Sequence, residues 1–461
     1  MTLIKSISGI RGTIGGKPAD GLSPLDVVKF VSAYSKQLQN KFYNKKLKVI
    51  MGRDARISGP MVSNIVSGTL NAMGIDVIDL GLSTTPTVEM AVTDHKAHGG
   101  VILTASHNPK QWNALKLLNE KGEFISGAEG EELLQIAEDE AFSYSEVDDL
   151  GRLTHDHNAI KNHIQQILDL ELVDVDTIQK ANFKVVLDAV NSTGGISILP
   201  LFDALGVDDV IGLYTEPTGE FPHNPEPLPE HLTEISEVVK KEGADVGFVV
   251  DPDVDRLAMV MENGEMFGEE YTLVAVADYI LQHKKGNTVS NMSSTRALRD
   301  VTESHGGSYA ASAVGEVNVV EMMRKTNAVI GGEGNGGIIY PDLHSGRDAL
   351  VGIALFLTYL AKKDMKVSEL KATYPQYAIS KNKIQLSEGM DVDGILAAMA
   401  DKYKDYPVST IDGVKIEIGK EWVHLRKSNT EPIIRIYSES RTLVDADKLA
   451  NKIIDEIKEL I

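Results

Sequence analysis

The hydrophobic pattern of the chain repeats a short apolar segment, a polar turn and a longer stretch with helical spacing. One copy begins at Lys48 and has a Gly-Ile-Asp turn at 74–76 before another apolar segment. A second copy begins at Lys184 with Gly-Val-Asp at 206–208, and a fainter third begins at Asn287. Strands alternating with helices are typical of α/β domains. The pattern therefore predicts three related α/β domains.

The pattern changes after about residue 372 to short alternating segments of the kind that form antiparallel strands. These segments are 382–386, 413–418, 422–426 and 433–439, and stretches with helical spacing lie at 391–404 and 444–460. The change predicts a separate, smaller α+β domain with an antiparallel sheet. The expected domain boundaries are 1–152, 153–258, 259–372 and 373–461.

Two further segments limit the fold. The longest apolar stretch, Ala349 to Ala361, is shorter than the ~18 to 20 residues that span a bilayer, so it predicts a buried helix. The Pro-rich segment 216–229 predicts a loop, because neither a helix nor a central strand accommodates so many prolines. Because the longest apolar stretch is too short to span a bilayer, we expect no association with a membrane.

Composition and charge narrow the class of ligand. The chain has 46 basic and 67 acidic side chains, a net charge of -21, which disfavours nucleic acid and anionic lipid as partners. An anionic ligand would need Arg and Lys gathered in one place. There is no cysteine, and the first fifteen residues lack the apolar core of a signal peptide, so we expect a cytoplasmic protein.

A serine after a predicted strand is the first candidate for chemistry. Apolar residues 101–103 end in Thr-Ala-Ser-His-Asn-Pro, and small residues before a proline predict a rigid turn that presents Ser106 to solvent. Neither Gly-x-Ser-x-Gly nor Ser-x-x-Lys is present, which removes the signatures of acyl transfer. From these residues alone, a turn-capping serine is favoured over a nucleophile, and His107 is favoured as a turn-stabilising donor over a base.

Three carboxylates at alternate positions follow the buried segment that ends at residue 250. Asp251, Asp253 and Asp255, held extended by Pro252, can converge on one hard cation. Arg256 stands where an EF-hand loop needs glycine, so that type of site is excluded. Oxygen ligands without His or Cys favour Mg²⁺ over Zn²⁺. The alternative is a solvated acidic turn, which the crowding of three carboxylates disfavours.

Two later segments carry groups suited to a sugar phosphate. Residues 331–337 contain Gly-x-Gly-x-x-Gly, but an extended segment follows instead of the helix that a dinucleotide site requires. The glycines leave a tight loop in which Glu333 and Asn335 can accept from sugar hydroxyls, with a flexible hairpin as the favoured alternative. Segment 422–437 offers the donors that a phosphate dianion needs, or forms an ordinary polar turn. These donors are Arg426, Ser428, Asn429, Thr430 and Arg435.

Together, four motifs resemble the α-D-phosphohexomutase family across the whole chain and in the family's order. They are TASHNP (104–109), DPDVDR (251–256), GGEGNGG (331–337) and RKSNTEP (426–432). The resemblance implies four domains around a central cleft, of which three are similar α/β domains with mixed sheets and the last is smaller. It also implies an enzyme that interconverts hexose or hexosamine 1-phosphates and 6-phosphates.

The same resemblance implies a role for each site residue. Ser106 would be a phosphoserine that ligates Mg²⁺ together with the three aspartates, and a hexose 1,6-bisphosphate would be both intermediate and activator. Lys116, Arg11 and His107 are the remaining candidates for catalysis, by proton transfer or by stabilising charge. The implied substrate-binding residues are Arg256, Glu333, Asn335, Arg426, Ser428, Asn429, Thr430 and Arg435.

The chain departs from the family pattern at three positions. Asn335 and Gly337 stand where many members have Ser and His, and Ala114 stands where glycine is usual before the lysine. The preferred sugar therefore stays open among glucosamine, mannose and glucose, as does the choice between monomer and homodimer. The alternative functions are an Mg²⁺-dependent sugar phosphatase and a non-catalytic sugar-phosphate-binding protein.

Overall fold

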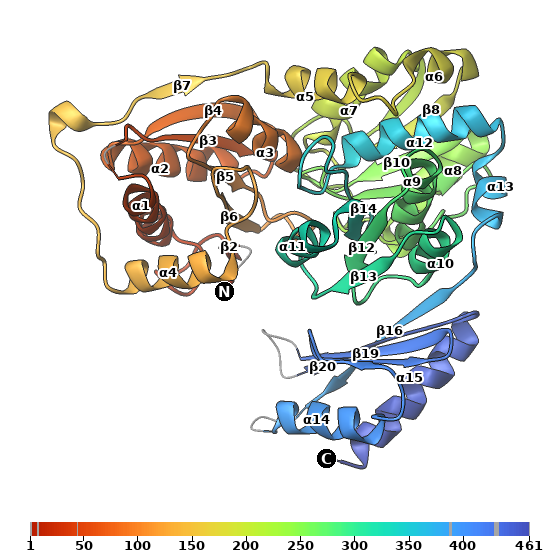
Figure 1. The fold of residues 1–461 in the computed structure, drawn as a ribbon. Coiled ribbons are helices and arrows are strands. Elements are labelled where there is room, and N and C mark those ends of the chain that lie inside the picture. Colours follow the sequence, from red (N-terminus) through yellow and green to blue (C-terminus); the bar gives the residue numbers. More distant parts are fainter. Residues whose placement is uncertain (1, 7–8, 44, 387–389, 428–432, 461) are drawn as a thin grey trace. The chain divides into compact units, whose positions relative to one another are not determined.

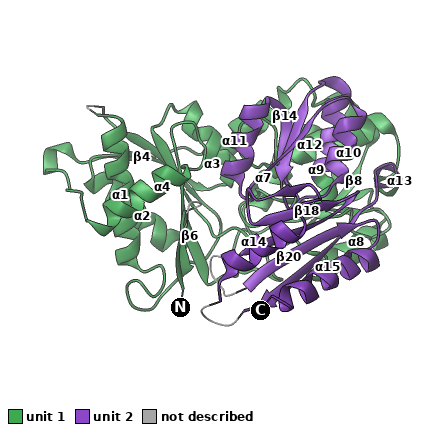
Figure 2. Ribbon diagram, turned by 60° about the horizontal axis from the view of Figure 1, so that its bottom comes forward, with its two compact units in different colours: residues 1–272, 336–368 green, residues 273–335, 369–461 purple. Residues whose placement is uncertain are grey.

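The computed structural model describes residues 2–6, 9–43, 45–386, 390–427 and 433–460. It contains two compact units, coloured separately in Figure 2. Unit 1 comprises Met1–Thr272 and Gly336–Ser368, and unit 2 comprises Leu273–Asn335 and Glu369–Ile461. Each unit is described by itself.

The first sheet of unit 1 has seven strands in the order β1-β2-β6-β5-β3-β4-β7 (Figure 1). The central strands β5, β3 and β4 are parallel, while β6 runs antiparallel to both β5 and β2. The bounds are β1 Leu3–Ser6, β2 Gly9–Thr13, β3 Lys48–Arg53, β4 Asp76–Leu82, β5 Gly99–Leu103, β6 Trp112–Leu118 and β7 Leu153–His155. The helices are α1 Pro24–Lys41, α2 Gly59–Ala72, α3 Thr85–Asp94 and α4 Gly127–Glu138, with a 3-10 turn at Val147–Asp149.

Local sequence explains where the central elements of this sheet begin and end. Strand β5 is buried along its whole length, as its continuous apolar run predicts. Helix α1 begins after Ser23, whose side chain forms a capping box with Asp26, and Pro24 occupies its first turn. Helix α3 begins after Thr84, whose hydroxyl accepts from the backbone N–H of Thr87. These caps fix where α1 and α3 begin.

The second sheet of unit 1 has the order β11-β10-β8-β9, with β11 antiparallel to three parallel strands. Its apolar helix α12 is buried over residues 349–360, which confirms the predicted buried helix. The strands are β8 Lys184–Asp188, β9 Asp209–Leu213, β10 Val246–Val250 and β11 Leu257–Met261. The helices are α5 Ala159–Leu168, α6 Val175–Ala181, α7 Gly194–Leu205, α8 Thr233–Glu242 and α12 Ala349–Lys363, with a 3-10 turn at Pro229–His231; the short strand β15 is Gly337–Ile339.

Unit 2 holds two further sets of strands. Strand β12 pairs in parallel with β13 and β14, and the C-terminal sheet β16-β20-β19-β18-β17 is antiparallel throughout. The strands are β12 Asn287–Asn291, β13 Tyr309–Ser312, β14 Ala328–Glu333, β16 Ala378–Gln385, β17 Val408–Ser409, β18 Val414–Ile418, β19 Glu421–Lys427 and β20 Ile433–Ser440. The helices are α10 Ala297–Ser304, α11 Glu316–Thr326, α14 Val392–Lys402 and α15 Leu443–Lys458; α9 Glu269–His283 and α13 Val367–Ala372 cross from one unit to the other.

These sheets confirm the predicted fold class, with three α/β domains of mixed sheets and a smaller antiparallel C-terminal domain. The expected loop at 216–229 contains no helix or strand before the 3-10 turn that starts at Pro229. The four domain boundaries stay a prediction. Among the described helices, none has the length and apolar character that crossing a bilayer requires.

Candidate active site

The serine turn follows β5 and is held against the aspartate loop. Ser106 has a positive φ of 48°, a conformation that is costly for a residue with a Cβ. Its N–H donates to Thr104 Oγ1 at 2.9 Å, and its Oγ donates to Asp251 Oδ2 at 2.7 Å. The expectation that Ser106 faces solvent is wrong: the residue is 4% exposed, because the turn folds onto the aspartate loop.

A buried guanidinium holds this turn from behind. Arg56 is fully buried, and its side chain donates only to backbone carbonyls and to Asp54 among the described residues. The carbonyl acceptors are Asn108 at 2.7 Å, Pro109 at 2.8 Å, Trp112 at 3.0 Å and Ser106. One side chain therefore fixes the backbone from the serine to Trp112.

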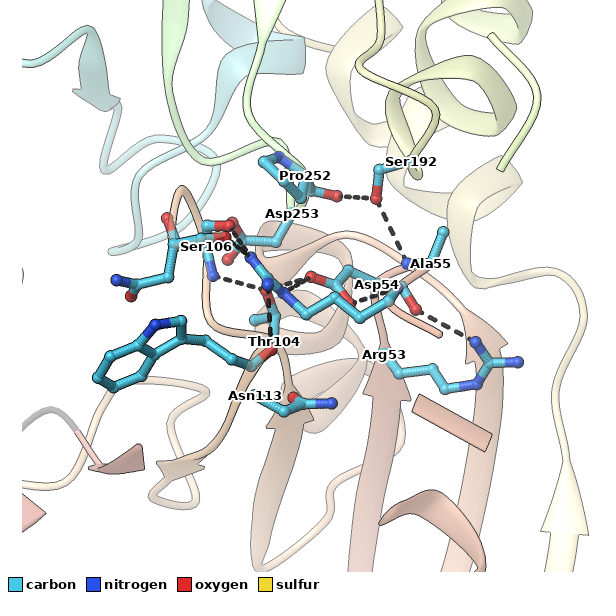
Figure 3. A network of polar contacts seen from close by, with 12 residues as sticks. Arg53, Asp54, Ala55, Thr104, Ser106, Asn113, Ser192, Pro252 and Asp253 are labelled. Atoms are coloured by element: carbon cyan, nitrogen blue, oxygen red, sulfur yellow. Dashed lines mark hydrogen bonds and ion pairs between the residues drawn. The ribbon is translucent and has the colours of Figure 1, made fainter. Parts of the chain in front are cut away.

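Asp54 completes this clamp. Its carboxylate accepts from Thr104 Oγ1 at 2.7 Å (Figure 3). It also pairs with Arg56 Nε at 3.0 Å, and both charged side chains are fully buried. Sequence reasoning missed the pair. The available signal was the sequence Arg-Asp-Ala-Arg directly after a predicted strand, since buried charges of this kind need a partner nearby.

The aspartate loop follows β10, and its three carboxylates are completely buried. One oxygen from each of Asp251, Asp253 and Asp255 lies within 4.8 Å of the others. Within the described residues, Oδ1 of Asp253 and Oδ1 of Asp255 have no hydrogen-bond partner. Burial and the two neighbouring carboxylates raise the pKa of Asp251 well above its usual value. A donor set of oxygens only, with buried oxygen atoms left over, fits Mg²⁺.

Lys116 lies on β6 and reaches the same loop. Its Nζ is 2.7 Å from Asp253 Oδ2 and 3.7 Å from Asp255 Oδ2. Burial by itself would lower the pKa of Lys116, but the two carboxylates raise it above its usual value. Burial likewise opposes ionisation of Asp253, yet the ammonium lowers the pKa of this carboxyl below its usual value. The lysine is therefore a fixed positive charge beside the aspartates.

Other cations complete this part of unit 1. Arg347, which sequence reasoning missed, donates to Asp255 Oδ2 at 2.6 Å, and Nε of Arg256 lies 4.0 Å from Asp255 Oδ1. Arg11 on β2 donates to Asn108 Oδ1 at 3.1 Å. Burial and the charges of Arg256 and Arg11 lower the pKa of His107 well below its usual value, so this imidazole is neutral at pH 7. The cations that an anionic ligand would need are thus gathered beside Ser106.

The remaining predicted residues belong to unit 2. The buried Glu333 accepts through Oε1 from Asn291 Nδ2 at 2.8 Å and from the Gly315 N–H at 3.0 Å. Arg426 Nε lies 2.9 Å from Asp412 Oδ2. Asn335 follows two residues after β14, and Arg435 is exposed on β20 opposite Arg426. Ser428, Asn429 and Thr430 lie outside the described residues.

Comparison with known families gives matches over almost the whole chain. Four models of phosphoglucomutase/phosphomannomutase domains match in order. They are the α/β/α domain I at residues 3–144, domain II at 161–264, domain III at 268–377 and the C-terminal domain at 382–456.

Individual relatives match this chain over nearly the whole length of both chains. A phosphoglucomutase/phosphomannomutase of Thermococcus kodakarensis is 35% identical, over 94% of each chain. A phosphoglucosamine/phosphogalactosamine mutase of Sulfurisphaera tokodaii is 32% identical, over 98% of each chain. The crystal structure of a phosphoglucomutase/phosphomannomutase family protein from Burkholderia thailandensis superimposes with a TM-score of 0.86 at 26% identity, covering 99% of this chain and 98% of the other.

Proposed function

The chain belongs to the phosphoglucomutase/phosphomannomutase family of hexose phosphate mutases, and from this premise we propose that Ser106 carries the phosphoryl group between the 1- and 6-positions of the sugar. Mutases of this kind are isomerases that move phosphate within a sugar, and the family depends on Mg²⁺. The proposed substrates are the phosphates of glucosamine, mannose or glucose. We also propose a cytoplasmic location and a monomer or homodimer.

One contact carries the proposal. Ser106 Oγ and Asp251 Oδ2 are 2.7 Å apart although 145 positions separate them in the chain. The hydroxyl that would be phosphorylated therefore lies beside the carboxylates that fit a divalent cation. When bound by Ser106 and the three aspartates, Mg²⁺ would supply positive charge to the transferring phosphoryl group.

The proposed transfer exchanges one P–O bond for another. The bond between phosphorus and Ser106 Oγ breaks as the 6-hydroxyl oxygen of a 1-phosphosugar forms its own bond to phosphorus. The proton of that hydroxyl ends on Ser106 Oγ, and the neutral His107, with Nδ1 at 3.3 Å from Oγ, is positioned to relay it. Lys116, Arg11 and Arg256 offset the charge of the phosphoryl oxygens. The second half runs in the opposite direction: Ser106 Oγ forms a bond to the phosphorus at the 1-position, the bond from phosphorus to the sugar 1-oxygen breaks, and the serine proton passes to that oxygen.

The remaining site residues are proposed to bind the rest of the substrate, as the family resemblance implies. Glu333 would accept from sugar hydroxyls, with Asn335 beside it, and Arg426 would bind the phosphate that is not being transferred, together with Arg435 and residues 428–430. A hexose 1,6-bisphosphate forms between the two transfers in this scheme. Added from outside, the same compound would phosphorylate Ser106 in enzyme that has lost the group.

The test combines product analysis with the mass of the protein. We expect glucose 1-phosphate, Mg²⁺ and a trace of glucose 1,6-bisphosphate to yield glucose 6-phosphate with little inorganic phosphate. Ser106→Ala should abolish turnover and the gain of one phosphoryl group seen by mass spectrometry, while Ser308→Ala, at an exposed serine, should change neither. A variant S106A that kept most of the rate would refute the phosphoserine.

The competing functions give different products. Dominant release of inorganic phosphate would identify a phosphatase. No reaction with glucose, mannose or glucosamine phosphates would identify a binding protein. Specificity constants for the three sugars decide which one is preferred.

A further inference from the structure

A second cluster of potential metal ligands lies in unit 1, made of other residues than the site described above. It contains His163 on α5, His344 in the segment before α12, and Asp348, which caps α12. One ligand atom from each lies within 4.8 Å of the others. The side chains of His163 and Asp348 are 1% and 0% exposed, and that of His344 is 12% exposed. None of these residues is used in the proposed reaction.

The separations between these atoms are those of hydrogen bonds and are close to the distance between two ligands of one metal ion. His163 Nε2 is 2.9 Å and His344 Nε2 is 3.3 Å from the same oxygen, Asp348 Oδ2. Tetrahedral ligands at about 2.0 to 2.1 Å from a zinc ion lie about 3.3 Å from one another. The other oxygen, Oδ1, accepts from the backbone N–H of Leu350 at 2.8 Å. Asp348 is thereby held with Oδ2 directed at both imidazoles.

Each histidine has an oxygen near Nδ1 that can accept a proton when Nε2 binds a metal. Nδ1 of His163 is 2.9 Å from Thr87 Oγ1, which can accept its proton and leave Nε2 as a ligand. Nδ1 of His344 accepts from the Gly346 N–H at 3.1 Å and lies 3.5 Å from Glu89 Oε2. Ligation through Nε2 of His344 would therefore break the bond to Gly346 and place the ring proton on Nδ1, where the Glu89 carboxylate can accept it. A carboxylate behind a ligating histidine is a recurrent feature of zinc sites.

Charge also favours a cation in this cluster. The side chains of Asp348 and Glu89 are 0% and 1% exposed, and among the described residues the ionic partners of Asp348 are the two histidines. A buried carboxylate needs compensating positive charge. A divalent ion supplies it while both imidazoles stay neutral, which is the state in which they act as ligands.

We propose that His163, His344 and Asp348 form a structural binding site for Zn²⁺ or a similar transition-metal ion, with Thr87 and Glu89 orienting the two histidines. Two imidazoles and one carboxylate select such an ion over Mg²⁺, which prefers oxygen ligands. The fourth ligand position is left to water.

The proposed ion would join segments that support the aspartate loop. Next to Asp348, Arg347 donates to Asp255, and the Ala349 N–H donates to Val254 O at 3.2 Å. On α3, Thr85 Oγ1 donates to Asp253 Oδ2 at 2.6 Å. A metal that ties α5 to the start of α12, with α3 behind it, would stabilise the elements that position the catalytic carboxylates.

The experiment measures zinc binding by the full chain in excess Mg²⁺, which occupies the aspartate loop. The protein is stripped of metal with a chelator and dialysed against Zn²⁺ and millimolar Mg²⁺. The amount of zinc bound per chain is then measured by inductively coupled plasma mass spectrometry. Co²⁺ serves as an optical probe, because its visible absorption reports tetrahedral nitrogen ligation. We expect about one zinc per chain and a higher melting temperature with zinc.

Variants decide where the ion binds. His344→Gln and His163→Gln should each weaken zinc binding by at least about tenfold and abolish the thermal shift. Asp253→Asn, in the aspartate loop, and the double variant His155→Gln/His157→Gln, at an exposed stacked pair, should bind zinc as the wild type does. Wild-type protein that keeps no zinc under these conditions, or H344Q with unchanged affinity and a normal melting curve, would overturn the proposal.

Discussion

The loops after β3 and β8 occupy equivalent places in the two repeated segments, yet they support the site by different chemistry. An aspartate stands directly after β3 and another at the last position of β8, and the Oδ1 of each accepts the backbone N–H two residues later: Asp54 from Arg56 at 3.0 Å and Asp188 from Val190 at 3.0 Å. The residue at that second position then differs. Arg56 places a guanidinium against the serine turn, whereas Val190 is apolar and has a φ of 49°.

The second loop uses hydroxyl groups instead of charge. Ser192 Oγ and Thr193 Oγ1 donate to Pro252 O, in the aspartate loop, at 2.7 and 2.8 Å. Ser192 Oγ also accepts from the Ala55 N–H at 3.3 Å, which joins the two loops (Figure 3). In both segments the loop at the carboxyl end of the strand holds a neighbouring loop in place. The loop after β3 holds the serine turn, and the loop after β8 holds the aspartate loop.

Replacing Arg56, the charged residue of the loop after β3, should have the largest effect on stability and on kcat. Arg56→Val, which installs the residue of the second copy, leaves the buried Asp54 uncompensated, so we expect about 3 to 5 kcal/mol of lost stability. Arg56→Lys keeps the positive charge but loses the forked guanidinium group. The melting temperature of this variant should lie closer to that of the wild type. Because the serine turn loses its carbonyl contacts, kcat in R56K should fall by about a hundredfold with little change in KM. Unaltered kcat would show that the clamp does not position the serine.

Removing the joining hydroxyl should have an intermediate effect. Ser192→Ala deletes the bond to Pro252 O and leaves the buried Ala55 N–H without its acceptor, which we expect to cost about 1 to 3 kcal/mol. Thr193→Val deletes one bond at nearly constant volume and should cost about 1 kcal/mol. Thermal melting and kcat are measured for both variants. Equal losses in the two would mean that the link to Ala55 contributes nothing.

The smallest effect should be pH-dependent. His223 Nε2 lies 3.0 Å from Asp188 Oδ2, where the first copy has the Arg56 guanidinium. Burial opposes protonation, but the hydrogen bond and charge of Asp188 raise the pKa of His223 above its usual 6.5. The stabilisation is thus complete below pH 6.5 and lost as pH rises through the folded-state pKa. His223→Gln should lower the free energy of unfolding by up to about 1 kcal/mol at pH 6 and by less at pH 9. Melting temperatures at the two pH values measure this difference. His157→Gln, at an exposed histidine, should show no such difference.

Local patterns predicted more of the fold than of the site. Strand β20 and the buried helix α12 follow from alternation and from apolar length, because both depend on nearby residues. The grouping of Ser106 with the aspartates came from resemblance, and the structure places the two loops in direct contact. Which group serves which catalytic role stays a prediction.

The rest could not be predicted because distant backbone atoms are involved. Arg56 binds carbonyl groups more than 50 positions away along the chain, and nothing in those residue types marks them as acceptors. Arg347 and the cluster around Asp348 likewise join segments that are far apart in sequence. The burial of Ser106 depends on the aspartate loop that covers it, which the turn residues alone do not reveal.

The hydrogen bonds that join the loops after β3 and β8 limit which parts of the proposed site can move during catalysis. From Arg56 to Pro252 one hydrogen-bonded network within unit 1 holds both the serine turn and the aspartate loop, so Ser106 could move away from the aspartates only by breaking these bonds. In the proposed reaction, both ends of a bisphosphate must reach this one serine. If the serine turn stays in place, the bisphosphate has to reorient between the two transfers.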